Sequence, residues 1–193
     1  ITKAPDGEYF GEAFLDDDGI HNHPVAIKVK IKVEGDKLEI DFKGTASQVK
    51  SNMNSPFASS VSSAIACVKS VLTDPDIPFN EGAERAIFVK IPYGSILNPR
   101  PRAPVRARLL PSYRVVNAVM QALGQAVPER VIAPGFDTTS VSCLSHKSDD
   151  GYNIYLEIFG GGFGAGPNHD GCDAVDSMLS NCSNIPIEAM ESD

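Results

Sequence analysis

The chain has 193 residues, of which 17 are basic and 25 acidic, so its formal net charge is −8. Nucleic-acid binders normally carry a basic face, and we therefore expect no nucleic-acid partner. No apolar run approaches the roughly 18 residues that a membrane span requires, so we expect no membrane partner either. The four cysteines form no CxxC pair, which favours reduced thiols and a cytoplasmic protein.

The first forty residues predict an antiparallel meander of three strands. In the run 25–33 every odd position is β-branched and apolar, and three of the even positions are lysine. This period of two is typical of a strand with one face on the core and the other in water. Residues 34–36 then predict a turn, 38–42 a second strand, and the earlier run 8–15 a third.

An acidic triplet and two histidines lie between the first two strands. The triplet 16–18 lacks the alternating carboxylates of an EF-hand and predicts a turn. His21 and His23 are two residues apart, which on a strand would place both imidazoles on one face. Two imidazoles can begin a metal site, but no third ligand is near in the sequence, so a loop before Pro24 is the alternative.

Three segments show the apolar spacing of helices. Ser55 is the expected N-cap of the first, over 57–72, whose other face is mostly serine and is expected to lie against another surface. Ser112 is the expected N-cap of the second. The third covers 175–182, and Asp170 is its natural N-cap.

Further strands are predicted at 86–91, 137–144 and 152–159, and the loop 145–151 joins the last two as a hairpin. Strands and helices do not alternate regularly as they do in βαβ proteins. The expected fold class is therefore α+β, an antiparallel meander and hairpins packed with about three helices.

The segment 98–108 is extended, rich in proline and locally basic within an acidic chain. Its four arginines stand at 100, 102, 106 and 108, and Arg106 and Arg108 are candidates for contact with a substrate or a partner. Guanidinium groups bind phosphates, carboxylates and acidic protein surfaces. Pairing with the excess carboxylates of the chain itself is the alternative.

The most unusual stretch is 159–173, which reads F-G-G-G-F-G-A-G-P-N-H-D-G-C-D. It contains the relaxed G-x-G-x-x-A form of a dinucleotide-binding loop, after a predicted strand and before a predicted helix. However, Pro167 and the polar residues after it delay the helix, and no following strand is visible. We therefore predict a close-packed backbone turn, which glycine permits because it has no Cβ.

Polar side chains follow these glycines. His169 and Asp170 are the catalytic candidates, as an acid–base or metal pair, although neighbouring residues usually point apart. Gly162, Gly164, Asn168 and Asp170 are candidates for contact with substrate or with another subunit. A tight turn followed by a helix cap is the alternative for the whole corner.

Several short motifs occur in a fixed order along essentially the whole chain. They are L-D-D-D-G-I at 15–20, D-F-K-G-T at 41–45, I-P-F-N-E-G at 77–82, P-Y-G-S at 92–95, G-G-G-F-G-A at 160–165, and then Asn181, Asn184, Pro186 and Glu188. Each motif alone is weak, but the ordered set resembles the hydantoinase B/oxoprolinase family.

The resemblance implies an ATP-dependent enzyme that opens cyclic amides such as N-methylhydantoin or 5-oxoproline, together with a hydantoinase A-type ATPase subunit. Related members are subunits of acetone- or acetophenone-type carboxylases, so a ketone carboxylase subunit is one alternative and a non-catalytic scaffold or interface domain is another. The resemblance implies ATP and a divalent metal for the whole enzyme. It does not imply that ATP or the metal binds to residues 1–193, because the metal motifs of the family lie upstream of the equivalent of Ile1.

The resemblance also implies that 1–193 is an internal fragment of a longer subunit, with two subdomains at 1–55 and 56–193 as an open alternative. We expect such a fragment to be inactive alone, and self-association into a homo-oligomer stays open. Asn80 and Glu81 lie in a matched motif and join the candidates for contact with substrate or partner.

Overall fold

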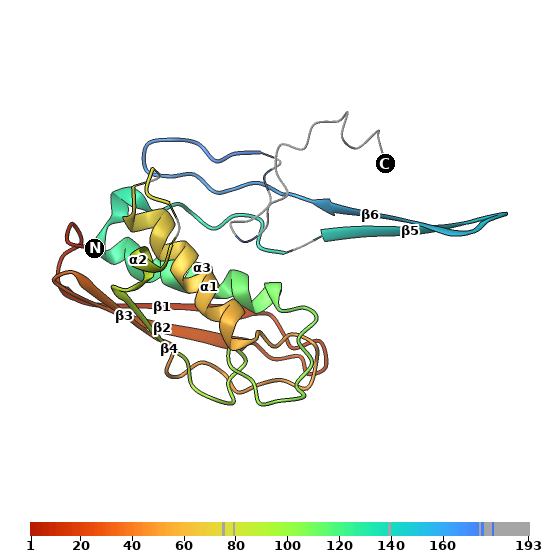
Figure 1. Ribbon diagram of the computed structural model, residues 1–193, viewed down its shortest axis with the longest axis horizontal. Helices are drawn as coiled ribbons and strands as arrows, with labels where there is room; N and C mark the ends of the chain where they lie inside the picture. Colours follow the sequence, from red (N-terminus) through yellow and green to blue (C-terminus); the bar gives the residue numbers. More distant parts are fainter. Residues whose placement is uncertain (75, 79, 139, 174, 176–178, 180–193) are drawn as a thin grey trace.

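The computed structural model describes residues 1–74, 76–78, 80–138, 140–173, 175 and 179, and these form an α+β fold (Figure 1). A four-stranded sheet carries two long helices on one face, and a separate two-stranded hairpin projects beyond this body. The fold class expected from the sequence is confirmed. The division into two subdomains stays a prediction.

The sheet has the strand order β1 (Gly7–Leu15), β2 (Val25–Glu34), β3 (Lys37–Asp41) and β4 (Ile87–Lys90). The first three strands pair antiparallel, as the meander predicts, and Gly35 turns the chain between β2 and β3 with a φ of +60°. The odd-numbered residues of β2 are all buried, whereas its lysines lie on the other face among carboxylates of β1. The period of two therefore gave the correct strand and the correct buried face.

The strand predicted at 86–91 is present as β4, and no pairing direction was predicted for it. It lies parallel to β3, with Leu38 opposite Ile87 and Asp41 opposite Lys90. A parallel pair needs a crossover connection, which is supplied by α1 (Phe57–Leu72) and the short α2 (Glu81–Glu84). A run of four residues carries no signal of its pairing direction, so this parallel pair could not be predicted from the sequence.

Two long helices, α1 and α3 (Leu109–Ala126), pack on the inward face of the sheet, and the 3₁₀ turn η1 (Pro128–Arg130) follows α3. On α1, Ser60 and Ser63 are buried, so part of the serine-rich face does lie against another surface. The third predicted helix, 175–182, lies outside the described residues except for Val175 and Leu179.

No helix within the described ranges is long and apolar enough to cross a membrane.

Both predicted serine caps are wrong. Pro56 occupies the N-cap position of α1, and no side chain caps this helix. The helix α3 begins before Ser112, which Pro111 allows because the first helical turn leaves its N–H groups unpaired in any case. The Ser112 hydroxyl donates to the Arg108 carbonyl at 2.9 Å and lies 3.3 Å from the Ser55 hydroxyl, so the two serines meet in the interior.

The predicted hairpin near the end of the chain is present as β5 (Ser140–Ser148) and β6 (Gly151–Phe159). Its ladder runs from the pair Ser140 and Phe159 to the pair Ser148 and Gly151. The turn contains two residues, Asp149 and Asp150, and is shorter than the loop 145–151 expected from the sequence. The strands are longer because a ladder continues through polar residues when both faces are largely exposed.

The backbone of β1 approaches α3 with no side chain between them. A Cβ on Gly11 would overlap with the carbonyl oxygen of Ala118 and would lie 3.1 Å from the amide nitrogen of Ala122. Beside this contact, the Gln121 side chain accepts a hydrogen bond from the Glu12 N–H at 2.7 Å. Gly11 therefore determines how closely α3 lies against the sheet.

We expect Gly11→Ala to lower the free energy of unfolding by about 2–3 kcal/mol, because the new methyl group meets rigid backbone and forces α3 away from β1. Gly7→Ala on the same strand is the matched control. There the new Cβ would meet the flexible Tyr9 side chain at 3.1 Å, so the cost should stay below about 1 kcal/mol. Urea unfolding followed by circular dichroism measures both, and equal effects of the two variants would contradict this account.

Candidate functional site

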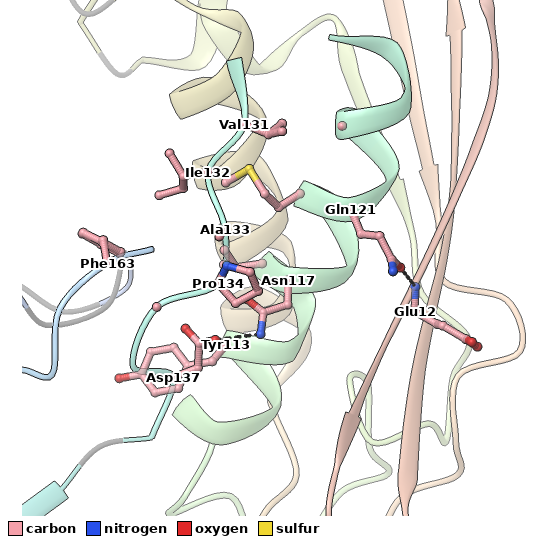
Figure 2. A pocket seen from close by; sticks show the side chains of 14 residues that line it. Glu12, Tyr113, Asn117, Gln121, Val131, Ile132, Ala133, Pro134, Asp137 and Phe163 are labelled. Atoms are coloured by element: carbon pink, nitrogen blue, oxygen red, sulfur yellow. Dashed lines mark hydrogen bonds between the residues drawn. The ribbon is translucent and has the colours of Figure 1, made fainter. Parts of the chain in front are cut away.

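The best-formed cavity lies between α3, the edge of β1 and the segment that follows η1 (Figure 2). Its volume is about 310 Å³. The walls are mostly apolar, with Val116 and Met120 from α3, Val131 and Ile132 from the following segment, and Phe163 from the glycine-rich stretch. A small organic molecule could enter such a space, since binding pockets are typically apolar with a few polar groups.

The polar groups of this cavity centre on Asp137. The Asn117 side chain donates a hydrogen bond to the Asp137 carboxylate at 2.8 Å, and Arg114 donates to the Asp137 backbone carbonyl at 2.9 Å. Burial raises the pKa of Asp137 above its usual value, although the Asn117 hydrogen bond and the Arg114 charge act in the opposite direction. The cavity thus presents amide and carboxyl groups side by side at one end of an apolar space.

Arg114, which is partly buried, adjoins Asp137. The Arg114 Nε is buried and has no hydrogen-bond partner within the described part of the chain. Arg114 and Asp137 also line a second, smaller hollow together with Asp16 and Asp17. Asp137 therefore stands between two hollows, with a guanidinium group on one side and the Asn117 amide on the other.

None of these cavity residues was among the candidates drawn from the sequence. Asn117 lies within a predicted helix and Asp137 within a predicted strand, and twenty residues separate them. The one available signal was a polar residue, Asn117, directly after two apolar positions that face inward. Only the tertiary fold shows that the two side chains meet.

The structure places Gly162 and Gly164 in the backbone that flanks this cavity. The segment 133–136 runs beside them, with Ala133 N–H donating to the Ala165 carbonyl and Phe136 N–H to the Gly162 carbonyl, both at 2.9 Å. A Cβ on Gly164 would lie 2.6 Å from the Ala133 carbonyl oxygen, and Gly162 has a φ of +99°. These glycines permit close backbone contact, as the predicted turn requires.

The stretch does not present a phosphate cradle. The N–H groups of Gly162, Phe163 and Gly166 all donate to backbone carbonyls, at 2.9, 2.9 and 3.0 Å. Residues 171–173 contain no helix, so no helix N-terminus faces the glycines there. Three N–H groups of the stretch are therefore already paired and no helix follows within 171–173, which argues against the dinucleotide-loop interpretation.

The polar corner after the glycines is exposed and lies outside the cavity. Gly166 and His169 pair across a two-residue turn that contains Asn168. The His169 ring contacts the Asp170 backbone carbonyl at 3.0 Å rather than the Asp170 carboxylate. The structure thus does not bring His169 and Asp170 together as a side-chain pair, and their roles stay predictions.

The remaining candidates lie on exposed loops. Glu81 forms an ion pair with Arg85 at 3.5 Å, and Asn80 donates to the Pro78 carbonyl at 3.3 Å. Arg106 and Arg108 are exposed, and neither lines the cavity.

The four arginines of 98–108 form no ion pair with any described carboxylate, so the alternative of pairing within the chain is not found there. Arg100 instead lies over the Tyr93 ring, with 6.0 Å between the guanidinium carbon and the ring centroid.

The acidic triplet forms a turn, as predicted, with Asp18 at its centre. Asp18 is buried, and one carboxylate oxygen accepts hydrogen bonds from the Ile20 N–H (2.9 Å) and the His21 N–H (2.6 Å). The other oxygen lies 3.0 Å from the His21 ring Nδ1. The His21 side chain, followed by these backbone donors, lowers the pKa of Asp18 well below its usual range.

His21 and His23 have ring centroids 5.7 Å apart, and both side chains are exposed. Within the described residues, no group of three or more histidine, cysteine, aspartate or glutamate side chains is arranged to hold a metal ion. His21 closes the turn through its contact with Asp18, and a metal role for the histidine pair stays a prediction.

Comparison with known proteins shows the family. Residues 1–193 match the family described as hydantoinase B/oxoprolinase. The chain belongs to the hydantoinase B/oxoprolinase family.

Individual members of this family agree with that assignment. A protein of Pseudomonas sp. (strain NS671), named as the B subunit of a D-/L-hydantoinase, is 37% identical over 100% of this chain and 34% of its own length. The crystal structure of the ATP-dependent caprolactamase from Pseudomonas jessenii superposes with a TM-score of 0.79 and 27% identity, over 92% of this chain and 31% of that one.

An acetone carboxylase structure has the same fold, with a TM-score of 0.78 and 16% identity over 98% of this chain and 28% of its own. The chain thus spans about a third of the length of these relatives.

We expect Asp18→Asn to lower the melting temperature at neutral pH, because the charged carboxylate accepts three contacts that an amide cannot all replace. The pKa of Asp18 in the folded state lies below its ordinary value of 3.8, so the carboxylate stabilises the fold above about pH 4, and this contribution is lost as the pH falls toward the folded-state pKa. The difference in melting temperature between the two proteins should therefore be constant above about pH 5 and should shrink below about pH 4.

Asp16→Asn is the control for this series, since Asp16 is an exposed member of the same turn. Differential scanning calorimetry across pH measures all three proteins. An Asp18→Asn difference that grows as the pH falls would contradict the assigned role.

Proposed function

We propose that this chain is part of the B-type subunit of an ATP-dependent enzyme that opens cyclic amides, acting with a hydantoinase A-type ATPase subunit. The observation that carries the proposal is the family match over 1–193, together with 37% identity to the B-type protein of a hydantoinase across the whole chain. The related caprolactamase is described as ATP-dependent, and a caprolactam is itself a cyclic amide. N-methylhydantoin and 5-oxoproline are the substrate types we favour.

The chemistry explains why such an enzyme would use ATP. A cyclic amide without ring strain is stabilised by resonance, so water attacks its carbonyl carbon slowly. Phosphoryl transfer from ATP to the amide oxygen, supported by a divalent metal, would release ADP and remove the amide resonance, so that water could add to the ring carbon. The C–N bond would then break with protonation of the nitrogen, and hydrolysis of the remaining acyl phosphate would give the ring-opened acid and inorganic phosphate. In this proposal the ATPase partner binds ATP. The described residues contribute the binding and orientation of the substrate.

The cavity beside α3 is the part of the chain that we assign to the substrate ring. Its apolar walls suit the ring carbons, while Asn117 and Asp137 can hydrogen-bond the planar amide. The volume of about 310 Å³ is at the lower end of the range for small-molecule sites, which suits a ligand of this size. Asp137 would accept from the amide N–H, and Asn117 would orient the Asp137 carboxyl group.

A ketone carboxylase subunit is the second candidate function. It is favoured by the fold that this chain shares with acetone carboxylase, but at 16% identity that likeness concerns the fold alone. A scaffold or interface role is the third, and it is favoured by the exposed positions of Asn168, His169 and Asp170. Cyclic-amide hydrolysis ranks first because the relatives of higher identity carry hydantoinase and caprolactamase names.

We expect the full-length protein, co-expressed with an A-type ATPase subunit, to hydrolyse ATP only when a cyclic amide is present. Hydantoin, N-methylhydantoin, 5-oxoproline and caprolactam are the substrates to compare, with ADP and the ring-opened acid measured in equal amounts. The chain 1–193 alone should give no product. ATP hydrolysis that requires acetone or acetophenone together with bicarbonate would instead establish the carboxylase alternative.

We expect Asn117→Ala and Asp137→Ala to raise KM for the cyclic amide by about tenfold or more in the assembled enzyme, because each removes a hydrogen bond in an apolar site. Asp36→Ala is the control, since Asp36 is an exposed turn residue that does not line the cavity and should leave KM within about twofold. Steady-state kinetics at saturating ATP separate KM from kcat. An unchanged KM in both cavity variants would show that the substrate does not bind in this cavity.

A further inference from the structure

The hairpin of β5 and β6 has one strongly apolar face. Residues that pair directly across an antiparallel ladder lie on the same face, and alternate pairs lie on opposite faces. One face carries the pairs Val141 and Ile158, Cys143 and Leu156, Ser145 and Ile154, and Lys147 and Tyr152. The other face carries the apolar pair Leu144 and Tyr155 and also Phe159, but most of its residues are polar, among them Asn153 and Glu157. We call the first set the apolar hairpin face.

The apolar hairpin face is open to solvent in the described structure. The exposed fractions are 71% for Tyr152, 70% for Ile154, 58% for Leu156 and 48% for Val141. No residue of this face belongs to the hydrophobic core formed by the described residues. A two-stranded hairpin is at best marginally stable in water, and a contiguous exposed apolar patch typically marks an interaction site. Another protein surface is therefore expected to cover it.

The position of the hairpin separates its tip from the described core. Both strands leave the body at the same end, and the arm extends away from the sheet and helices (Figure 1). Nine residues per strand give a length of about 30 Å at about 3.4 Å per residue. Side chains near the tip, such as Tyr152, are thus far from the core that α1 and α3 complete.

The charges of the arm argue against a second copy of the same chain. The hairpin and its turn carry one lysine, Lys147, against three carboxylates at Asp149, Asp150 and Glu157. The whole chain has a formal charge of −8, so stacking two such arms would bring like charges together. The charge pattern instead fits a surface with an apolar centre and basic residues near the acidic tip.

We propose that the apolar hairpin face is the docking surface for a different polypeptide of the complex, namely the ATPase subunit of the proposed function. Related proteins are named as the B subunit of a hydantoinase and the beta subunit of a caprolactamase, which places such chains in assemblies with other subunits. Stable interfaces between subunits have apolar centres and polar rims, which is the distribution seen on this arm. The inference rests on the proposed function only for the identity of the partner.

Cys143 provides a direct probe, because it is a free, exposed thiol on the apolar hairpin face and pairs with Leu156. In the full-length protein alone, iodoacetamide should label Cys143 readily. In the complex with the ATPase subunit, its labelling rate should fall at least about tenfold, since thiol reactivity requires access. Peptide mass spectrometry measures the labelling of each cysteine separately, so two other cysteines serve as internal controls. Cys172 is exposed outside the arm and should stay reactive in both states. Cys67 is buried, which raises its pKa to about 12, and it should stay unreactive in both states.

Two substitutions on adjacent residues of β6 test the face itself. Ile154→Asp places a charge in the apolar hairpin face and should weaken binding of the ATPase subunit at least about 100-fold. Asn153→Asp adds the same charge on the opposite face and should change the dissociation constant less than about threefold. Both positions are exposed, and circular dichroism checks that each variant keeps the wild-type fold. Ile154→Ala should give an intermediate loss without an added charge.

Each alternative occupant of the apolar hairpin face predicts a different labelling result, and any of these results would overturn the proposal. Protection of Cys143 in the full-length protein alone, at every concentration, would show that the same polypeptide covers the face. Protection that appears only as the concentration of that protein rises would show a second copy. An Ile154→Asp variant that binds the ATPase subunit as tightly as the wild type would also overturn it.

Measuring cyclic-amide turnover distinguishes the proposed function from the proposed docking surface. A complex that forms through the arm but opens no cyclic amide would contradict the proposed function and leave the docking surface in place. Full turnover with Ile154→Asp would contradict the docking surface and leave the function in place.

Discussion

Burial of one face of β2 is the constraint on which the rest of the body depends. Its alternating β-branched residues have to be covered, and the sheet has no second layer of strands to cover them in the described part of the chain, so α1 and α3 do so together. The close contact at Gly11 then determines the position of α3 against the sheet. Because α3 carries Asn117, the same packing that completes the core also positions the polar end of the cavity.

The glycine-rich stretch serves this arrangement through its backbone. It pairs with 133–136 on one side and with Cys172 and Val175 on the other, so three segments lie close together where a Cβ would not fit. The stretch thereby pairs the N–H groups of Gly162, Phe163 and Gly166 with backbone carbonyls. It also brings Phe163 to the wall of the cavity, opposite α3. The stretch is thus a structural support for the cavity, and its conspicuous composition reflects close backbone packing.

The sequence predicted the parts of the fold that depend on local periodicity. The period of two in β2 identified the strand and its buried face, and the apolar spacing in α1 and α3 identified both helices. The buried face of α1 was only partly predicted, because Phe57 is exposed while Ser60 and Ser63 are buried. The serine caps failed because Ser55 and Ser112 are buried against one another, a contact between residues 57 positions apart in the sequence. The parallel pairing of β4 could not be predicted either, since no local pattern indicates the direction in which a short strand pairs.

The site was harder to predict than the fold, and the reason is physical. The sequence candidates were chosen because their residue types are reactive or conspicuous, as with His169 and Asp170, yet the structure leaves these on an exposed turn. The cavity instead uses Asn117 and Asp137, whose significance comes from burial and from each other. A carboxylate becomes chemically distinctive when it is desolvated beside a specific partner, and both conditions are created by α3 and the 131–137 segment packing together. The core and the cavity are therefore products of one packing arrangement, while the β5–β6 arm lies outside it. That separation fits a body that holds its site by internal contacts and an arm whose apolar face is completed by another molecule.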